Sequence, residues 1–218
     1  MILMINGSMR GNGGNTGCIF RKLAEQLEDR YEIVEERTYL KDFEPLAEKI
    51  KRADALVMGQ PLYVDGIPSN VIRFMEFMLE NHSGEYPDLP VYAVTNLGFW
   101  EGNQAYIQHE QIGHWCKRMG MKFSGAIGIG SGPMMKVLDK SPMTWGPNME
   151  YGKGIIRLAK AIDAGETMEN IYTHPRILNR PVYIKIANYS MSRLAAENGL
   201  KPKDFVRVPV SYWDKDAK

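Results

Sequence analysis

The residues best suited to chemistry lie near the N-terminus, in a segment rich in glycine and in small polar side chains. Residues 6–16, the first loop, read N-G-S-M-R-G-N-G-G-N-T and follow the apolar run Met1–Ile5. Residues at helical spacing come directly after them. Free backbone N–H groups and the positive end of a helix dipole favour an anion at such a place. The first loop is therefore predicted to bind a phosphate group, in preference to being a flexible surface loop.

The residue types in the first loop narrow the kind of phosphate. A Walker loop requires Gly-Lys-Ser/Thr, and the first loop contains no lysine. The dinucleotide-binding pattern G-x-G-x-x-G, counted from Gly11 and Gly13, would need glycine where Thr16 stands. The hydroxyl and amide groups of Ser8, Asn15 and Thr16 favour a terminal monophosphate held by many neutral donors.

Two further segments carry residues that suit a flat heterocycle. The second loop, residues 60–68 (Q-P-L-Y-V-D-G-I-P), places Tyr63 in a backbone restricted by a proline near each end. The third loop, residues 95–102 (T-N-L-G-F-W-E-G), combines two glycines with two adjacent aromatic residues. Each segment alone is also consistent with a plain strand-to-helix connection. Together with the first loop, they indicate a binding site.

The elements that must position these loops alternate between short apolar runs and stretches of helical spacing. The runs predict strands at residues 1–5, 32–37, 53–59, 91–95 and 123–129. Helical spacing predicts helices at residues 15–27 (with Asn15 or Thr16 as N-cap), 44–52, 68–79, 112–119 and 155–162. Five alternating units predict a doubly wound, five-stranded parallel sheet between two helical layers. Ligands bind at the carboxyl ends of the strands in such sheets, where all three loops fall.

Composition excludes several classes of protein. The 218 residues carry 27 Lys+Arg and 26 Asp+Glu, and a net charge of +1 gives no field that would attract nucleic acid or an anionic membrane. Two cysteines are too few for a disulfide framework or an iron–sulfur cluster, and the histidine spacing predicts no metal site. No apolar run approaches the ~20 residues of a membrane span. Without a signal-peptide pattern, a cytoplasmic location is expected.

The first and second loops together resemble those of a known family. I-N-G-S-M-R-G-N-G-G-N-T and P-L-Y-V-D-G-I-P are similar to the motifs G-S-x-R-x-x-G-N-T and P-x-Y-x-x-x-x-P of flavodoxin-fold NAD(P)H-dependent FMN reductases. The resemblance covers residues 1 to about 165, and the extra residue in Gly13-Gly14 departs from the pattern. It implies a flavodoxin-like α/β/α fold, FMN as cofactor and NADPH or NADH as co-substrate.

The resemblance also implies FMN contacts in each of the three loops. The phosphate would be held by Ser8, Arg10, Asn15, Thr16 and Gly17. The isoalloxazine ring would be lined by Pro61, Leu62, Tyr63 and Val64, and its pyrimidine side closed by Thr95, Asn96, Leu97, Gly98 and Phe99. Backbone donors of residues 95–98 would face the flavin N1. No catalytic side chain is expected, because the flavin itself carries the chemistry.

The expected function is hydride transfer from NAD(P)H to FMN and then to a small acceptor, such as a quinone, a flavin, a nitro or an azo compound. A flavodoxin-type electron carrier is an alternative, although such carriers are typically strongly acidic and this chain has a net charge of +1. A non-catalytic flavodoxin-fold assembly protein is another.

Residues 166–218 form a C-terminal extension beyond the predicted FMN-binding domain, residues 1–165. Within this extension, Tyr183, Ile186, Ala187 and Leu194 recur at helical spacing, and Asn198-Gly199 is typical of a helix end. An amphipathic helix over residues 181–194 is predicted to pack on the core or on a partner subunit. A homodimer is therefore expected.

Overall fold

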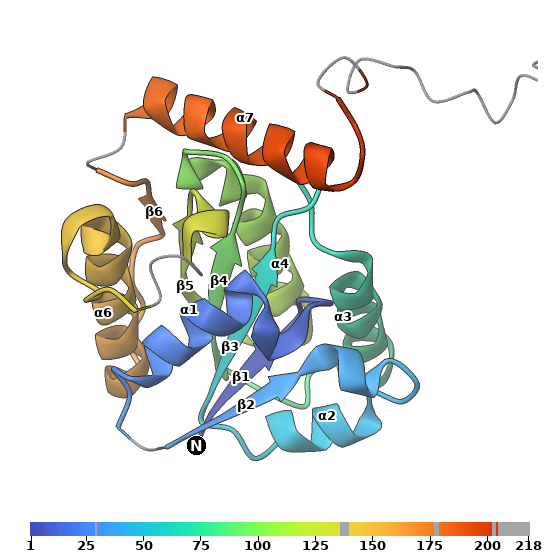
Figure 1. Ribbon diagram of the computed structural model, residues 1–218. Helices are drawn as coiled ribbons and strands as arrows, with labels where there is room; N and C mark the ends of the chain where they lie inside the picture. Colours follow the sequence, from blue (N-terminus) through green and yellow to red (C-terminus); the bar gives the residue numbers. More distant parts are fainter. Residues whose placement is uncertain (29, 136–139, 177–178, 202–203, 205–218) are drawn as a thin grey trace, which may run out of the picture. The chain divides into compact units, whose positions relative to one another are not determined.

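Parallel strands rich in apolar residues form the centre of the computed structural model (Figure 1). Within the described residues there are six, in the order β2-β1-β3-β4-β5-β6. They are β1 (Ile2–Asn6), β2 (Tyr31–Glu35), β3 (Ala55–Pro61), β4 (Pro90–Asn96), β5 (Lys122–Ile129) and β6 (Ile171–Thr173). The order of the first five is that of the flavodoxin-like doubly wound sheet. The predicted fold class is therefore confirmed.

The structure describes residues 1–28, 30–135, 140–176, 179–201 and 204. The chain divides into two compact units, residues 1–177 and residues 178–218.

Helices cover both faces of the sheet in the first unit. One face packs against α1 (Asn15–Ala24) and α6 (Met149–Ala164), and the other against α2 (Glu44–Ile50), α3 (Ser69–Asn81) and α4 (Tyr106–Met119). Successive strand residues point to opposite faces, so Ile2 and Met4 of β1 join the first core, and Leu3 and Ile5 join the second. A strand buried on both faces needs an unbroken apolar run, which is what residues 2–5 supply.

The prediction of five strands is wrong by one. β6 pairs in parallel with β5, through Ile127 with Ile171 and Ile129 with Thr173. It is only three residues long and lies beyond Gly165, where the sequence analysis expected the extension to begin. A strand this short shows no clear periodicity, which explains why the sequence did not reveal it.

In the described part of the chain, no helix has both the length and the apolar character needed to cross a membrane.

The second unit contains α7 (Arg180–Glu197), which confirms the helix predicted there. The Asn179 side chain accepts a hydrogen bond from the N–H of Val182 at the start, and Gly199 adopts a left-handed φ of 75° beyond the end. The helix is not amphipathic, however. Exposed apolar side chains occur in two stripes on opposite sides of it: Val182, Ile186 and Tyr189 in one, and Ile184, Met191 and Leu194 in the other. Residues 205–218 of the extension lie outside the described residues.

Candidate functional site

The first loop is held in shape by hydrogen bonds among its own residues. The side chain of Asn6, the last residue of β1, accepts a hydrogen bond from the N–H of Ser8 (3.1 Å) and donates one to Asn12 Oδ1 (3.0 Å). The Ser8 hydroxyl accepts from the N–H of Arg10 (3.3 Å). The small polar residues of the loop therefore serve its own geometry as well as any ligand.

The carboxylate of Glu35, at the end of β2, clamps the first loop to the sheet. It accepts hydrogen bonds from the backbone N–H of Asn12 (2.7 Å) and from Arg37 Nε (2.7 Å). These bonds, that from Asn12 first, hold the pKa of Glu35 below its usual 4.5. The clamp is thus fully formed above pH 4.5 and is lost as the pH falls through the lowered pKa of Glu35.

The start of α1 is left open toward the first loop. Its N-cap is Gly14, not Asn15 or Thr16 as predicted, and no side chain of the described residues caps the helix. The first helical bond runs from the N–H of Cys18 to the carbonyl of Gly14 (3.1 Å). The preceding N–H groups of the first turn have no partner within the helix, and together with the helix dipole they suit an anion.

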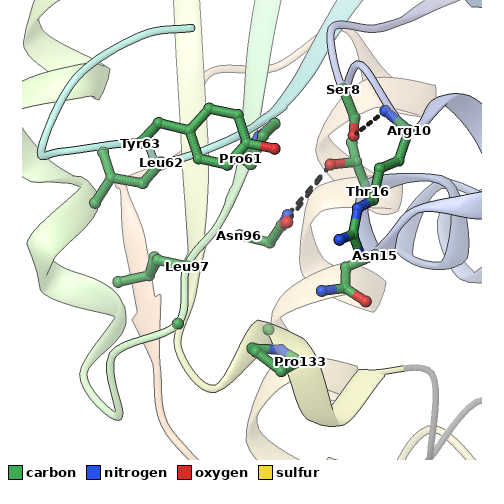
Figure 2. Close-up of a pocket in the computed structure, with 12 residues that line it drawn as sticks. Ser8, Arg10, Asn15, Thr16, Pro61, Leu62, Tyr63, Asn96, Leu97 and Pro133 are labelled. Carbon is green, nitrogen blue, oxygen red and sulfur yellow. Dashed lines mark hydrogen bonds between the residues drawn. The ribbon is translucent and has the colours of Figure 1, made fainter. Parts of the chain in front are cut away.

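A cavity of about 230 Å³ opens beside this helix start (Figure 2). The side chain of Asn96 donates to the Thr16 hydroxyl (3.2 Å), which joins β4 to α1 at the cavity wall. Among the described lining residues, Arg10 alone carries a charge. The lining comprises Ser8, Arg10, Asn15 and Thr16 from the first loop, Pro61, Leu62 and Tyr63 from the second, Asn96, Leu97 and Gly98 from the third, and Gly132 and Pro133.

Four of the residues expected to contact FMN do not line this cavity: Gly17, Val64, Thr95 and Phe99. Val64 is fully exposed and Phe99 is 52% exposed. Thr95 is buried on the opposite face of the sheet, because it is next to Asn96 in β4. The N–H of Leu97 donates to the carbonyl of Ile129 (3.1 Å), so this donor is not free for a ligand as expected.

Gly17 has a packing role that the sequence did not reveal. A Cβ atom at this position would lie 2.3 Å from the carbonyl oxygen of Asn12 and 2.5 Å from its Cα. Only glycine lets the first loop approach the first turn of α1 so closely.

Two lining residues after β5, Gly132 and Pro133, were not among the site residues expected from the sequence. They belong to a short 3-10 helix (Gly132–Met134) and complete the cavity wall. The N–H of Gly132 donates to the carbonyl of Leu97 (2.7 Å). Just before it, Ser131 adopts a left-handed φ of 57°. The topology of the sheet could have predicted this segment as part of the site, because the carboxyl end of β5 lies at the same sheet edge as the three loops.

The aromatic residues of the second and third loops have different surroundings. Tyr63 is half-exposed and lines the cavity. The ring of Trp100 packs on His174, with ring centroids 4.3 Å apart, and does not line the cavity. Of the three aromatic residues in these loops, Tyr63 alone is placed to cover a flat ligand.

The donors and the apolar walls occupy different parts of the cavity. Backbone N–H groups, hydroxyls and the Arg10 guanidinium lie at the first loop, and Pro61, Leu62 and Leu97 lie across from them (Figure 2). A molecule that is anionic at one end and flat at the other is the ligand that this arrangement suits.

Comparison with known proteins agrees with this arrangement. Residues 1–130 match the family described as NADPH-dependent FMN reductase. No curated protein sequence matches the chain significantly.

Solved structures share the fold at low sequence identity. A flavone reductase matches with a TM-score of 0.55 at 15% identity, over 77% of this chain and 66% of its own. General stress protein 14 from Treponema denticola, solved in complex with FMN, has a TM-score of 0.55 at 12% identity, over 74% of this chain and 98% of its own. An NADPH-quinone reductase from P. pentosaceus has a TM-score of 0.53 at 12% identity, over 74% and 96%.

The family match spans more than half of the chain and contains the first, second and third loops. This chain therefore belongs to the NADPH-dependent FMN reductase family of oxidoreductases.

Proposed function

We propose that this protein binds FMN in the cavity beside α1 and catalyses electron transfer from NADPH or NADH to a small acceptor, such as a quinone, a free flavin, a nitro or an azo compound. The observation that carries the proposal is the cavity itself. It joins an uncapped helix start, at Gly14, to walls formed by the second and third loops. Membership of the NADPH-dependent FMN reductase family supports both the cofactor and the reductant.

The chemistry of the donors fits the FMN phosphate. The backbone N–H groups at the start of α1 would bind it together with the hydroxyls of Ser8 and Thr16, and the Arg10 guanidinium would add a charge-assisted bond. The Asn15 side chain lines the same end of the cavity and supplies an amide donor. Because hydrogen bonds within the first loop already fix its shape, little ordering would be needed on binding.

The remaining walls fit a flat ring. Pro61 and Leu62 would contact one part of the isoalloxazine, and Leu97, Gly132 and Pro133 another. FMN supplies hydride transfer when bound. The protein's part is to hold the ring still, exclude water with the buried Leu62 and Leu97, and leave one side accessible past the half-exposed Tyr63.

A steady-state assay tests this function. With FMN added, the protein is expected to oxidise NADPH in the presence of a quinone and to give parallel double-reciprocal lines. Ping-pong behaviour is expected because one accessible side must serve the reductant and the acceptor in turn. Comparing NADPH with NADH, and a quinone with nitro and azo compounds, would identify the preferred substrates. Turnover no faster than that of free FMN would contradict the proposal.

We also propose that α7 forms the contact between two copies of the chain. One stripe of the helix exposes Val182 (42%), Ile186 (48%) and Tyr189 (71%), and exposed apolar clusters of this kind are typical of interaction surfaces.

Light scattering on the full chain tests the assembly. The unaltered protein is expected to have the mass of a dimer, and the double variant Ile186→Glu, Tyr189→Glu that of a monomer, because each buried charge at an interface costs several kcal/mol. Asn188→Glu, at an exposed polar position of the same helix away from this stripe, is the matched control. A double variant that keeps the dimer mass would contradict the assignment of α7.

A further inference from the structure

A buried side-chain amide lies directly behind the second loop. Gln108, in the first turn of α4, is fully buried. Its Nε2 donates to the carbonyl oxygens of Pro61 (3.4 Å) and Gly66 (3.0 Å). Its Oε1 accepts from the Thr95 hydroxyl (2.5 Å) and from Gln60 Nε2 (3.4 Å). Both protons and both lone pairs of the amide are thus used.

This arrangement fixes the direction of a longer chain of hydrogen bonds. Because Thr95 donates its only hydroxyl proton to Gln108, its oxygen must accept from Nε2–H of His109 (3.1 Å). His109 then carries its proton on Nε2, and its Nδ1 accepts from the Tyr172 hydroxyl (3.4 Å). Burial lowers the pKa of His109 to about 4, which keeps this single tautomer neutral at pH 7.

The part of the second loop that Gln108 holds has an unfavourable backbone conformation. Val64 (φ 49°) and Asp65 (φ 58°) are both left-handed, although neither is glycine and valine is β-branched. The turn is closed by backbone bonds between Tyr63 and Gly66 (3.1 and 3.3 Å). Such a conformation persists only when its surroundings determine it. Among the described residues, Gln108 is the one side chain whose hydrogen bonds to the turn are seen.

We propose that Gln108 is a positioning residue for the flavin ring: through its bonds to Pro61 and Gly66 it holds the turn of residues 61–66, and hence Tyr63, against the isoalloxazine. Thr95, His109 and Tyr172 determine which end of the Gln108 amide faces the turn. The proposal rests on the proposed FMN site. It predicts a defect confined to ring binding, because the phosphate donors lie in the first loop, whereas the Gln108 amide bonds to Gln60, Pro61, Gly66 and Thr95.

Gln108→Glu is the decisive variant, because its effect depends on pH. A carboxylate accepts the bonds from Thr95 and Gln60 but cannot donate to the two carbonyls, whereas a protonated carboxyl donates to one of them. Burial raises a carboxyl pKa, so this switch is expected within the accessible pH range. At about pH 8 the affinities for FMN and for riboflavin should both fall roughly tenfold, since buried carbonyls lose their donor. Both affinities should recover toward about pH 5.5.

Two controls separate this proposal from the proposed function. Gln111→Glu, at an exposed position of the same helix, should leave both affinities unchanged at every pH. Competition of inorganic phosphate with FMN should be the same in Gln108→Glu as in the unaltered protein. If the unaltered protein binds no FMN, the proposed function fails. If it binds FMN and Gln108→Glu binds with unchanged or pH-independent affinity, the positioning role fails.

A second variant covers the outcome in which Gln108→Glu does not fold. Tyr172→Phe removes one hydroxyl at a half-buried position and leaves His109 Nδ1 without a donor. Ring binding should weaken roughly threefold, by the same factor for FMN and riboflavin. ¹⁵N NMR of the unaltered protein should show His109 with its proton on Nε2 at neutral pH. A proton on Nδ1, or equal ring binding in Tyr172→Phe, would overturn the proposal.

Discussion

Gly17→Ala is expected to abolish tight FMN binding while the fold remains intact. The added Cβ would lie within 2.6 Å of three backbone atoms of Asn12, which are part of the first loop. Backbone cannot rotate away as a side chain can, so the loop must move off the start of α1. At least two charge-assisted bonds to the phosphate would then be lost, which weakens FMN binding by at least about a hundredfold. Fluorescence titration of the apoprotein with FMN measures the change.

Gly13→Ala is the matched control in the same loop. No atom lies within 4 Å of a Cβ at Gly13, so FMN affinity should stay within about twofold of the unaltered value. Alanine has a higher helix propensity than glycine, so Gly17→Ala should not destabilise α1 itself. Equal FMN affinity in the two variants would show that close contact between the first loop and the start of α1 is not needed to bind the phosphate.

Riboflavin, which lacks the phosphate, is expected to bind at least about a hundredfold more weakly than FMN. The reason is the chemistry of the first loop, where the Arg10 guanidinium, two hydroxyls and the N–H groups of α1 converge on one end of the cavity. Each charge-assisted bond is worth about 1.5–3 kcal/mol, and two are enough for a hundredfold difference. Isothermal titration with both flavins measures it.

The variant Arg10→Gln measures how much the guanidinium charge contributes to the difference between FMN and riboflavin affinity. It should reduce the preference for FMN and leave riboflavin affinity unchanged, because the guanidinium has no role at the ring. Similar affinities of the unaltered protein for the two flavins would mean that the first loop is not the phosphate site.

The sequence predicted the parts of this fold that depend on long apolar runs and on loop composition. Residues 2–5 could be identified as a central strand because parallel strands need apolar residues on both faces. The three loops could be placed at one edge because the topology of a doubly wound sheet requires it. Ser8, Thr16, Tyr63 and Leu97 accordingly line one cavity.

The remaining features depend on contacts between distant residues. Both Thr95 and Asn96 belong to the third loop and were expected to contact FMN. Adjacent residues of a strand point to opposite faces of the sheet, however, so only Asn96 reaches the cavity. Asp65-Gly66 predicts a turn in the second loop, but not that Val64 and Asp65 are both left-handed, because neither is the Asn or Gly typical of that conformation. Gln108, 42 residues beyond Gly66, helps to hold them there. Gly132 and Pro133 become part of the site only through the pairing of β5 beside β4.

The most direct test of the proposed function is to mix the FMN-loaded protein with NADPH in the absence of oxygen and follow the visible absorbance of the flavin. The proposed function predicts that this absorbance is lost in a single phase whose rate saturates with NADPH and is at least as fast as steady-state turnover. It also predicts that adding a quinone restores the absorbance. Bound FMN that stays oxidised with NADPH or NADH, yet is reduced by dithionite, would contradict the assignment as a reductase and favour an electron carrier.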